Sequence, residues 1–418
     1  MHICDKFSDR IQILKLCIEG GNSLKPIFQV LKNCCPNLKQ LRIEGKFIQA
    51  KDLDLFSPGE LPKKPNLTLF SLTCWNFYPE IEFVTALANF IQLVVKASPN
   101  LKVVTIPWGF YPNLPKSKHL ESLTIALDNV YPSDVADTQN VSKLLEMLRQ
   151  VDNHLVNLCF GTDQNQYMLV PSENYDFKKF RFRLSRRMPK LRKFSNRIVE
   201  MFQCADFLQN IEMMPSVETL LIGRELKELR SVDEILRGIC DKKMILAGVR
   251  KLELIELYDP RLLDGVATAF PNVEALEMNR LWVTDFEAEV TRLEVDVILE
   301  GCRGWGRLKR LKVTLPKYPT EMGAFIQALL QGRELFQRLA TLEINTYDGD
   351  FGTYELSEVE MDMFKQLLLE MDGMDRVTIH KISFGEDLVE NILTFMESNN
   401  LDVGKFRLYD GSPYRVGD

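Results

Sequence analysis

Residues 35–43 read Cys-Pro-Asn-Leu-Lys-Gln-Leu-Arg-Ile, and the spacing of their apolar side chains decides the fold. Leu38, Leu41 and Ile43 stand in the order L-x-x-L-x-I. The last two flank a single polar residue, which is the pattern of a strand with one buried face. The Pro-Asn pair before them favours a turn that ends a preceding helix. This segment therefore predicts a turn followed by a short strand.

The same hexad recurs along the whole chain, with a period of about 30 residues that is typical of repeat architectures. One hexad means little, because apolar residues are common, but about fourteen of them at a quasi-regular spacing indicate a repeat array over residues 1–418. The weakest is the seventh, in which Asn196 replaces the third apolar residue, and we expect its strand to be distorted. The hexads begin at Ile11, Leu38, Leu67, Leu101, Leu120, Leu155, Leu191, Val217, Val249, Val273, Leu308, Leu339, Met374 and Val403.

Most gaps between hexads contain one amphipathic helical pattern, such as residues 84–95. The residues that begin these helices have suitable chemistry. Ser357 and Glu360 have the spacing of a capping box, and Asp259 before Pro260 suits an N-cap followed by the first helical residue. The predicted unit is therefore a helix, a turn, a short strand and a loop.

Such a unit cannot bury both its helix and its strand alone, whereas stacked units can. We therefore predict an α/β solenoid in the form of a horseshoe, with a parallel sheet on the concave side and helices on the convex side. The alternative, a doubly wound α/β fold, needs strands that are apolar on both faces. The residues between the apolar positions are often Lys, Arg, Glu, Ser or Thr, so one strand face is expected to meet water.

The repeats resemble those of leucine-rich repeat proteins, and residues 33–43 are similar to repeats of the F-box/leucine-rich-repeat family. Members of that family are substrate receptors of cullin-type ubiquitin ligases, in which an N-terminal helical F-box docks an adaptor. The resemblance covers the whole chain for the repeat fold. It departs from the pattern at Glu44-Gly45, where many repeats carry Asn. Ten residues precede the first hexad, so no F-box domain is visible, and we expect that the chain either lacks one or belongs to a longer protein.

Composition argues against several function classes. The chain has 52 Lys and Arg against 58 Asp and Glu, a net charge of −6, so binding of nucleic acid by the whole surface is not expected. Residues 1–10 lack the apolar core of a signal peptide, and no segment is long and apolar enough for a membrane span. Nine cysteines form no CxxC and no Cys/His cluster, which favours free thiols. We expect a protein of the cytoplasm or nucleus.

No arrangement of catalytic residues emerges from the sequence. The four histidines are far apart, and no GxSxG, Walker or GxGxxG motif is present. The glycines of residues 301–306 have the wrong spacing for a phosphate loop and are predicted to end a helix. We therefore expect no catalytic site, cofactor or metal, and a non-enzymatic protein-recognition module. The resemblance implies a substrate receptor of a ubiquitin ligase, and the alternative is a ligase-independent scaffold or inhibitor.

We expect the partner protein to lie on the concave face and on the loops after the third and fourth strands. The strand residues there that face away from the core are small and uncharged, and burying them costs little. The loops are rich in aromatic residues, which form binding hot spots. Two simpler interpretations stay open, namely ordinary solvated polar residues and aromatic residues that pack within their loops. The predicted set is Ser71, Thr73, Thr105, Trp75, Phe77, Tyr78, Trp108, Phe110 and Tyr111, centred on the two tryptophans.

Residues 178–197 contain ten Lys and Arg and no acid. Phe177, Phe180, Leu184 and Met188 fall at helical spacing, so the segment is predicted to be a helix with its basic face outward. Three interpretations stay open: a phosphate-binding patch for RNA or anionic lipid, a docking face for an acidic partner, and a solvated convex helix. The basic patch is Lys178, Lys179, Arg181, Arg183, Arg186 and Arg187.

Overall fold

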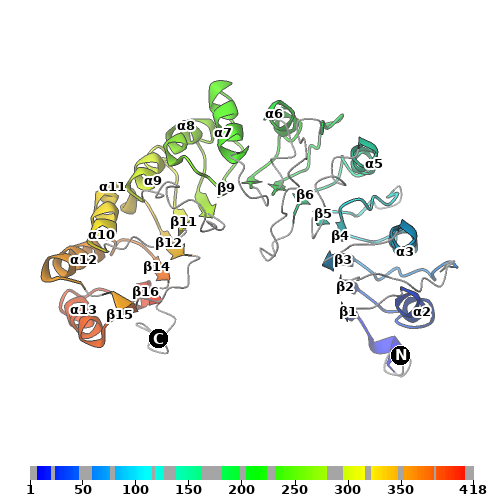
Figure 1. Ribbon diagram of the computed structural model, residues 1–418, viewed down its shortest axis with the longest axis horizontal. Coiled ribbons are helices and arrows are strands. Elements are labelled where there is room, and N and C mark those ends of the chain that lie inside the picture. Colours follow the sequence, from blue (N-terminus) through cyan, green and yellow to red (C-terminus); the bar gives the residue numbers. More distant parts are fainter. Residues whose placement is uncertain are drawn as a thin grey trace. The chain divides into compact units, whose positions relative to one another are not determined.

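The structure is a computed structural model in which the chain forms two compact units (Figure 1). The first unit comprises Met1–Val217 and Arg224–Leu229, and the second comprises Glu218–Gly223 and Arg230–Asp418. The structure describes residues 7–19, 24–46, 59–75, 81–114, 118–126, 138–161, 181–197, 204–223, 231–279, 295–315, 322–346, 353–354, 356–380 and 383–409.

In the first unit, consecutive strands pair in parallel and in chain order. They are β1 (Ile13–Glu19), β2 (Gln40–Lys46), β3 (Leu69–Trp75), β4 (Val103–Pro107), β5 (Ser122–Ala126), β6 (Asn157–Phe160) and β7 (Lys193–Asn196). The helical segments are η1 (Ser8–Arg10), α2 (Lys25–Asn33), α3 (Ile81–Ala97), α5 (Thr138–Arg149) and α6 (Cys204–Glu212). The α-helices cover one face of the strands (Figure 1).

The second unit repeats this arrangement, with parallel pairing in the order β8, β9, β10, β11, β12, β14, β16. These strands are Thr219–Ile222, Lys251–Ile255, Ala275–Asn279, Arg310–Leu315, Thr341–Thr346, Arg376–His380 and Phe406–Tyr409. A separate parallel pair joins β13 (Thr353–Tyr354) and β15 (Ser383–Phe384).

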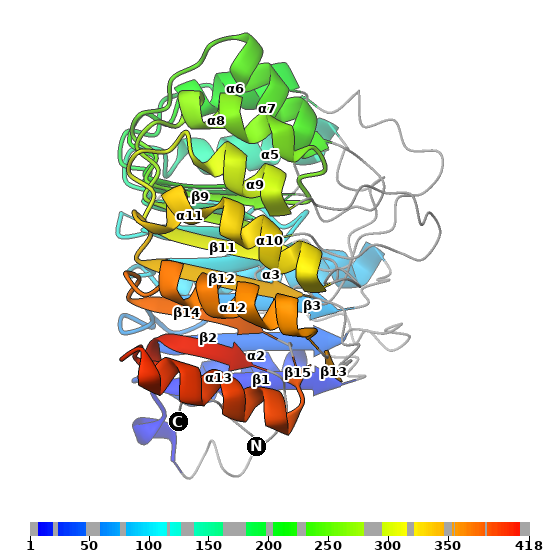
Figure 2. The ribbon, with the colours of Figure 1, turned by 90° about the vertical axis from the view of Figure 1, so that its left-hand side faces the viewer.

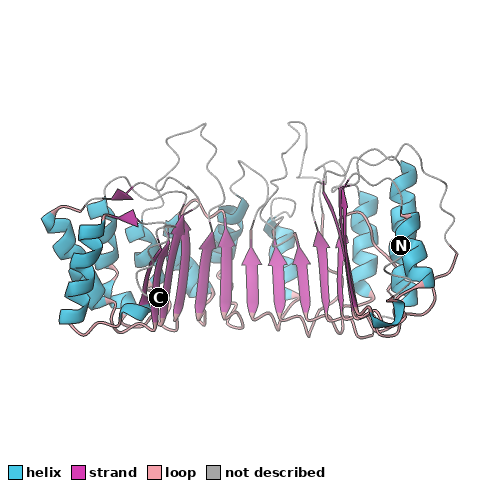
Figure 3. Cartoon of the chain, turned by 90° about the horizontal axis from the view of Figure 1, so that it is seen from below, coloured by secondary structure: helices cyan, strands magenta, loops and turns pink. Residues whose placement is uncertain are grey.

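The helices of the second unit also lie on one side of its strands (Figures 2 and 3). They are α7 (Ser231–Asp241), η4 (Pro260–Leu262), α8 (Leu263–Ala269), α9 (Val295–Cys302), α10 (Met322–Gln331), α11 (Arg333–Phe336), α12 (Glu358–Glu370), α13 (Glu386–Ser398) and η5 (Val403–Lys405). No helix in the described part of the chain has the length and hydropathy needed to cross a membrane.

All fourteen hexads coincide with strands that pair in parallel, which confirms the α/β repeat prediction. The expected distortion of β7 is wrong. This strand pairs in regular register with β6, Leu158 opposite Phe194 and Phe160 opposite Asn196. Asn196 is fully buried at the third core position of its hexad.

The core forms because equivalent positions of successive hexads pair with one another. Leu41 lies between Leu14 and Phe70, and Ile43 lies in the same way between Leu16 and Leu72. Leu41, Ile43, Phe70 and Leu72 are all completely buried. Each row of apolar side chains therefore runs across neighbouring repeats beneath the helices. One repeat needs the next in order to bury its apolar side chains.

A backbone carbonyl that accepts two hydrogen bonds recurs between successive repeats. The carbonyl of Lys39, the second residue of its hexad, accepts hydrogen bonds from the N–H groups of Thr68 (2.9 Å) and Leu69 (3.2 Å) in the next hexad. The carbonyl of Thr68 then accepts from Lys102 (2.8 Å) and Val103 (3.0 Å). The same shared acceptor recurs at Gln12, Lys102, Glu121 and Val156 in the first unit and at Glu218, Arg250, Glu274, Lys309 and Ala340 in the second.

The Pro-Asn turns add a side-chain bond of the same kind. The Asn37 amide donates to the carbonyl of Asp9 at 3.0 Å, and the Asn100 amide donates to that of Pro65 at 2.9 Å. In the second unit Asn272 donates in the same way to Ala247 at 2.9 Å. Each asparagine therefore ties its turn to the turn one repeat earlier, in addition to favouring the turn conformation itself.

Lys64 is buried, with only 4% of its surface exposed, and it joins the second and third repeats. Its Nζ donates to the carbonyls of Cys34 (2.8 Å) and Cys35 (3.1 Å) at the end of α2. Cys35 has a positive φ of 59°, so the chain reverses there and exposes these carbonyls. Burial lowers the pKa of the Lys64 amine.

Replacing Lys64 with Met should lower the free energy of unfolding by about 1–3 kcal/mol, because the two carbonyls lose a buried donor. Urea unfolding followed by circular dichroism measures this change. The exposed neighbour Lys63 supplies the control, since Lys63→Met should change the same quantity by less than about 0.5 kcal/mol. Equal stabilities of the two variants would show that the Lys64 contacts do not support the fold.

Candidate functional site

The predicted small polar residues form a row on the sheet face that carries no described helix. Ser71 of β3 pairs with Thr105 of β4, and Thr105 pairs with Thr124 of β5. Thr124 in turn pairs with Cys159 of β6. All four side chains are half-buried. We call Ser71, Thr105, Thr124 and Cys159 the hydroxyl strip, because three of the four members carry a hydroxyl group.

The hydroxyl strip is bounded on two sides. The next residue of the row, Ser195, is buried, so the accessible part ends at Cys159. Two residues further along β4 and β5, Pro107 and Ala126 are buried as well. The predicted Thr73 is half-buried and lies on β3 two residues beyond Ser71, opposite Glu44. The strand register thus places the three small residues of the predicted binding set, Ser71, Thr73 and Thr105, close to one another.

The predicted aromatic centre is wrong for Trp108 and Phe110, which are only 3% and 5% exposed. Trp108 continues the alternation of β4 from Ile106, so its indole turns to the core side. Its ring centroid lies 6.4 Å from that of Phe160 and 6.1 Å from that of Tyr111. An aromatic side chain held in this way cannot offer contact area to a partner.

The remaining aromatic residues of the predicted set have different outcomes. Tyr111 is half-buried, its hydroxyl oxygen is covered, and burial raises its pKa. Trp75 ends β3, but its side chain lies outside the described residues, as do Phe77 and Tyr78 entirely. A role for these three in binding stays a prediction.

The basic patch is not the predicted helix where the structure describes it. Residues 181–184 belong to neither a helix nor a strand, and Phe182 and Leu184 are buried while Arg181 and Arg183 are exposed. Leu184 and Met188 are both buried and four residues apart. This spacing fits one turn of a helix and also every second residue of a non-helical segment, so the spacing alone could not distinguish a helix from the observed structure. Arg186 and Arg187 are exposed, and Lys178 and Lys179 lie outside the described residues.

The corresponding row of the second unit carries a ladder of charges instead of hydroxyl groups. Glu253, Glu277, Lys312 and Glu343 pair in register across β9 to β12. The Lys312 Nζ lies 3.6 Å from Glu277 and 3.2 Å from Glu343, and the Lys251 Nζ lies 3.4 Å from Glu277. The sequence indicates charged residues here, but only the register shows that opposite charges meet.

Glu277 is the acid of this ladder that lies close to both lysines, Lys251 and Lys312. Burial alone would raise its pKa, but a hydrogen bond from the Asn279 amide (3.2 Å) and the charges of Lys312 and Lys251 outweigh burial and lower it. Burial alone would lower the pKa of Lys312, but Glu277 and Glu343 outweigh burial and raise it. Glu277 and Lys312 therefore stay ionised at neutral pH and present both signs of charge on the sheet face.

Comparison with known proteins does not assign a family. No protein-family model matches the chain, and no curated protein matches it. A crystal structure of a protein from Bacteroides fragilis has 13% sequence identity, with coverage of 72% of this chain and 69% of that chain. The TM-score of 0.37 is too low for the likeness to support any argument.

Trp108→Ala should act on stability and not through loss of an exposed contact. Removing a buried indole leaves a cavity beside Phe160, and we expect the free energy of unfolding to fall by about 3–5 kcal/mol. Thermal and urea unfolding measure this loss. Trp108→Phe, which keeps most of the ring volume, should lose clearly less. A fully stable Trp108→Ala variant would contradict the burial of this side chain.

Glu277→Gln should make the protein less stable at pH 7 by about 0.5–1 kcal/mol, because the ladder is partly exposed. The pKa of Glu277 is lower in the folded than in the unfolded state, so its ionic contribution is present above pH 4.5 and is lost as pH falls through the folded pKa. The stability difference between wild type and variant should therefore shrink in acid. The control is Glu397→Gln on α13, which should stay within about 0.5 kcal/mol at either pH.

Proposed function

We propose that this protein is a leucine-rich repeat recognition module that binds another protein through the hydroxyl strip. The observation that carries the proposal is the register of Ser71, Thr105 and Thr124, which places half-exposed hydroxyl groups in one row on three neighbouring strands. The family resemblance of the hexads agrees with this role.

The physical argument for the strip is its low cost of burial. Its members carry no charge, so a partner removes little bound water when it covers them, and each hydroxyl can donate or accept a hydrogen bond. Strands also hold the side chains rigidly, which limits the entropy lost on binding. The ladder of the second unit is charged and can steer a partner electrostatically.

Within this proposal, the resemblance to F-box/leucine-rich-repeat proteins suggests a substrate receptor of a cullin-type ubiquitin ligase, without catalytic residues of its own. The alternative is a scaffold or inhibitor that needs no ligase. Both functions use the same sheet face, so the strip does not distinguish them. Co-purification of a ligase adaptor with the protein expressed from its complete gene supports the receptor, and its consistent absence supports the scaffold.

The double variant Ser71→Arg/Thr105→Arg tests the strip directly. Proteins captured from cells by the wild-type chain should bind this variant at least about 30-fold more weakly, since two bulky charges then occupy the interface. The matched control is Ala88→Arg/Asn89→Arg on the exposed side of α3, which should bind as the wild type does. Circular dichroism should be the same for all three proteins. Equal binding by both double variants would refute the strip as the interface.

A further inference from the structure

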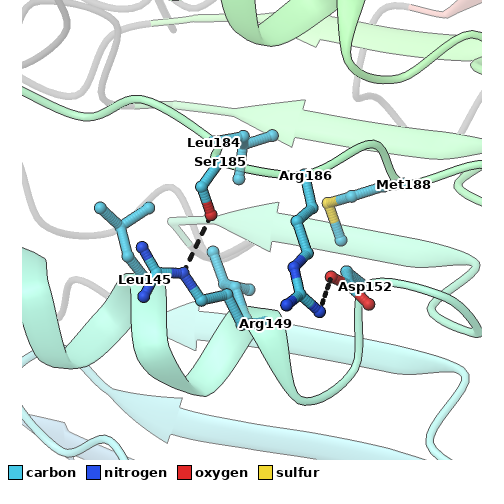
Figure 4. Close-up of a pocket in the computed structure, with 8 residues that line it drawn as sticks. Leu145, Arg149, Asp152, Leu184, Ser185, Arg186 and Met188 are labelled. Atoms are coloured by element: carbon cyan, nitrogen blue, oxygen red, sulfur yellow. Dashed lines mark hydrogen bonds and ion pairs between the residues drawn. The ribbon is translucent and has the colours of Figure 1, made fainter.

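Ser185 carries an exposed hydroxyl group in a segment that is neither helix nor strand. Its Oγ accepts a hydrogen bond of 2.9 Å from the Nε of Arg149, the last residue of α5, and Figure 4 shows the two side chains directed toward one another. Because the hydroxyl is the acceptor in this bond, its own proton is not used in it. The oxygen is therefore both accessible and held beside a guanidinium group.

The segment before Ser185 is anchored in the core, so the position of the hydroxyl is defined. Asn210 of α6 is buried; its Oδ1 accepts from the Leu184 N–H at 2.8 Å, and its Nδ2 donates to the Phe182 carbonyl at 2.9 Å. Phe182 and Leu184 are buried, whereas residues 185–187 are all exposed. An enzyme can therefore reach Ser185 at a surface bend without unfolding a helix or a strand.

Basic residues stand on both sides of Ser185 in the sequence. Protein kinases select their acceptor hydroxyls partly by the charge pattern of the flanking residues. The pattern here suits a kinase that prefers basic residues before and after the acceptor. Two arginines precede Ser185 and two follow it, and all four side chains are exposed: Arg181, Arg183, Arg186 and Arg187.

The charge of these arginines is only partly neutralised. Asp206, which is fully buried, pairs with the two preceding arginines, and Asp152, which is almost completely buried, lies 3.9 Å from Arg186. Arg149 and Arg187 form no ion pair within the described part of the chain. Two guanidinium groups near the hydroxyl thus keep a charge that no acid of the described residues offsets.

We propose that Ser185 is a phosphorylation site and that Arg149 holds the phosphate. The Ser185 oxygen bonds to the γ-phosphorus of a nucleoside triphosphate bound by a protein kinase, and the bond from that phosphorus to the bridging oxygen breaks. The nucleoside diphosphate leaves with the bridging oxygen, and the hydroxyl proton passes to a base of the kinase. The product carries a charge of about −1.5 to −2 at neutral pH.

The phosphate strengthens a contact that the unmodified chain already makes. The Nε of Arg149 keeps its bond to the Ser185 oxygen, and a terminal amino group of the same guanidinium binds a phosphate oxygen, which gives the bidentate geometry that arginine favours. This pair ties α5 more firmly to the segment that leads into β7. The new negative charge also offsets the charges of Arg149 and Arg187, so phosphorylation changes a basic surface into a nearly neutral one.

Other hydroxyl groups of the described residues lack one of the two features of Ser185. Thr378 of β14 accepts from the Nε of Arg376 at 3.1 Å, but it is only 2% exposed. Ser357 at the start of α12 is exposed, but its hydroxyl is bound to Glu360, whose carboxylate would repel a phosphate. The contact to α5 does not involve the hydroxyl strip, so the proposal is independent of the proposed function.

The first test is phosphorylation of the full folded chain. It uses ATP and the catalytic fragment of protein kinase C, a kinase that selects basic residues on both sides of its acceptor. Peptide mapping by mass spectrometry should locate a phosphate on Ser185, and Ser185→Ala should lose it. The matched control is Ser398→Ala, which removes an exposed serine of α13 beside Glu397 and should leave the modification of Ser185 unchanged.

The second test measures whether Arg149 holds the phosphate. A cation beside the phosphate favours its doubly charged form, so phosphorus NMR should give a second pKa below the usual value of about 6. Arg149→Gln should still be phosphorylated, but with a pKa at least about 0.3 units higher than in the wild type. Phosphorylation should raise the melting temperature of the wild type by at least about 2 °C and that of Arg149→Gln by less. The control Arg250→Gln, which removes an equal charge in the second unit, should behave as the wild type does.

Three results would overturn the proposal. The first is a folded chain in which Ser185 stays unmodified, whether or not other residues are phosphorylated. The second is a phosphate on Ser185 whose pKa and effect on melting are the same in Arg149→Gln as in the wild type, which would mean that Arg149 does not hold it. The third is an equal change in Arg250→Gln, which would mean an effect of net charge alone.

Discussion

The rest of the structure depends on one backbone acceptor per repeat. In eleven hexads the carbonyl of the second residue binds two N–H groups of the following hexad, as Lys39 does with Thr68 and Leu69. This contact fixes where each strand starts relative to its neighbour, and register follows from it. Because side chains alternate along a strand, a shift by one residue would exchange the buried and exposed faces. The register of the strands therefore determines both which residues form the core and which residues form the candidate sites.

The consequence is visible in two neighbouring residues of β4. Thr105 joins Ser71 and Thr124 on the face without described helices, whereas Ile106 enters the core with Ile125. Trp108 follows the same alternation and packs against Phe160 and Tyr111. A large aromatic residue after a strand is thus available to a partner only if the alternation turns it outward.

The two units hold their charges differently. In the first unit, Asp206 and Asp152 are buried beneath exposed arginines and order them from below. In the second unit, acids and lysines of adjacent strands neutralise one another on the sheet face, as Lys312 does with Glu277 and Glu343. Exposed pairs of this kind contribute little to stability. The described surface of the first unit over Asp206 and Asp152 thus keeps exposed arginines, whereas the sheet face of the second unit carries both signs of charge.

The sequence by itself determined the repeat, the strands and several helix starts, because these depend on neighbours in the chain. The L-x-x-L-x-I spacing predicts every described parallel strand except β13 and β15, and the Ser357–Glu360 capping box and the Asp259 cap form as expected. Tertiary structure alone decided which polar and aromatic residues are accessible. Residues 181–184 form no helix, and the Asn210 amide of α6 bonds their backbone instead; Trp108 is buried because Phe160 lies beside it from another repeat. Such contacts join residues far apart in the chain, so the spacing of residues within one segment does not predict them.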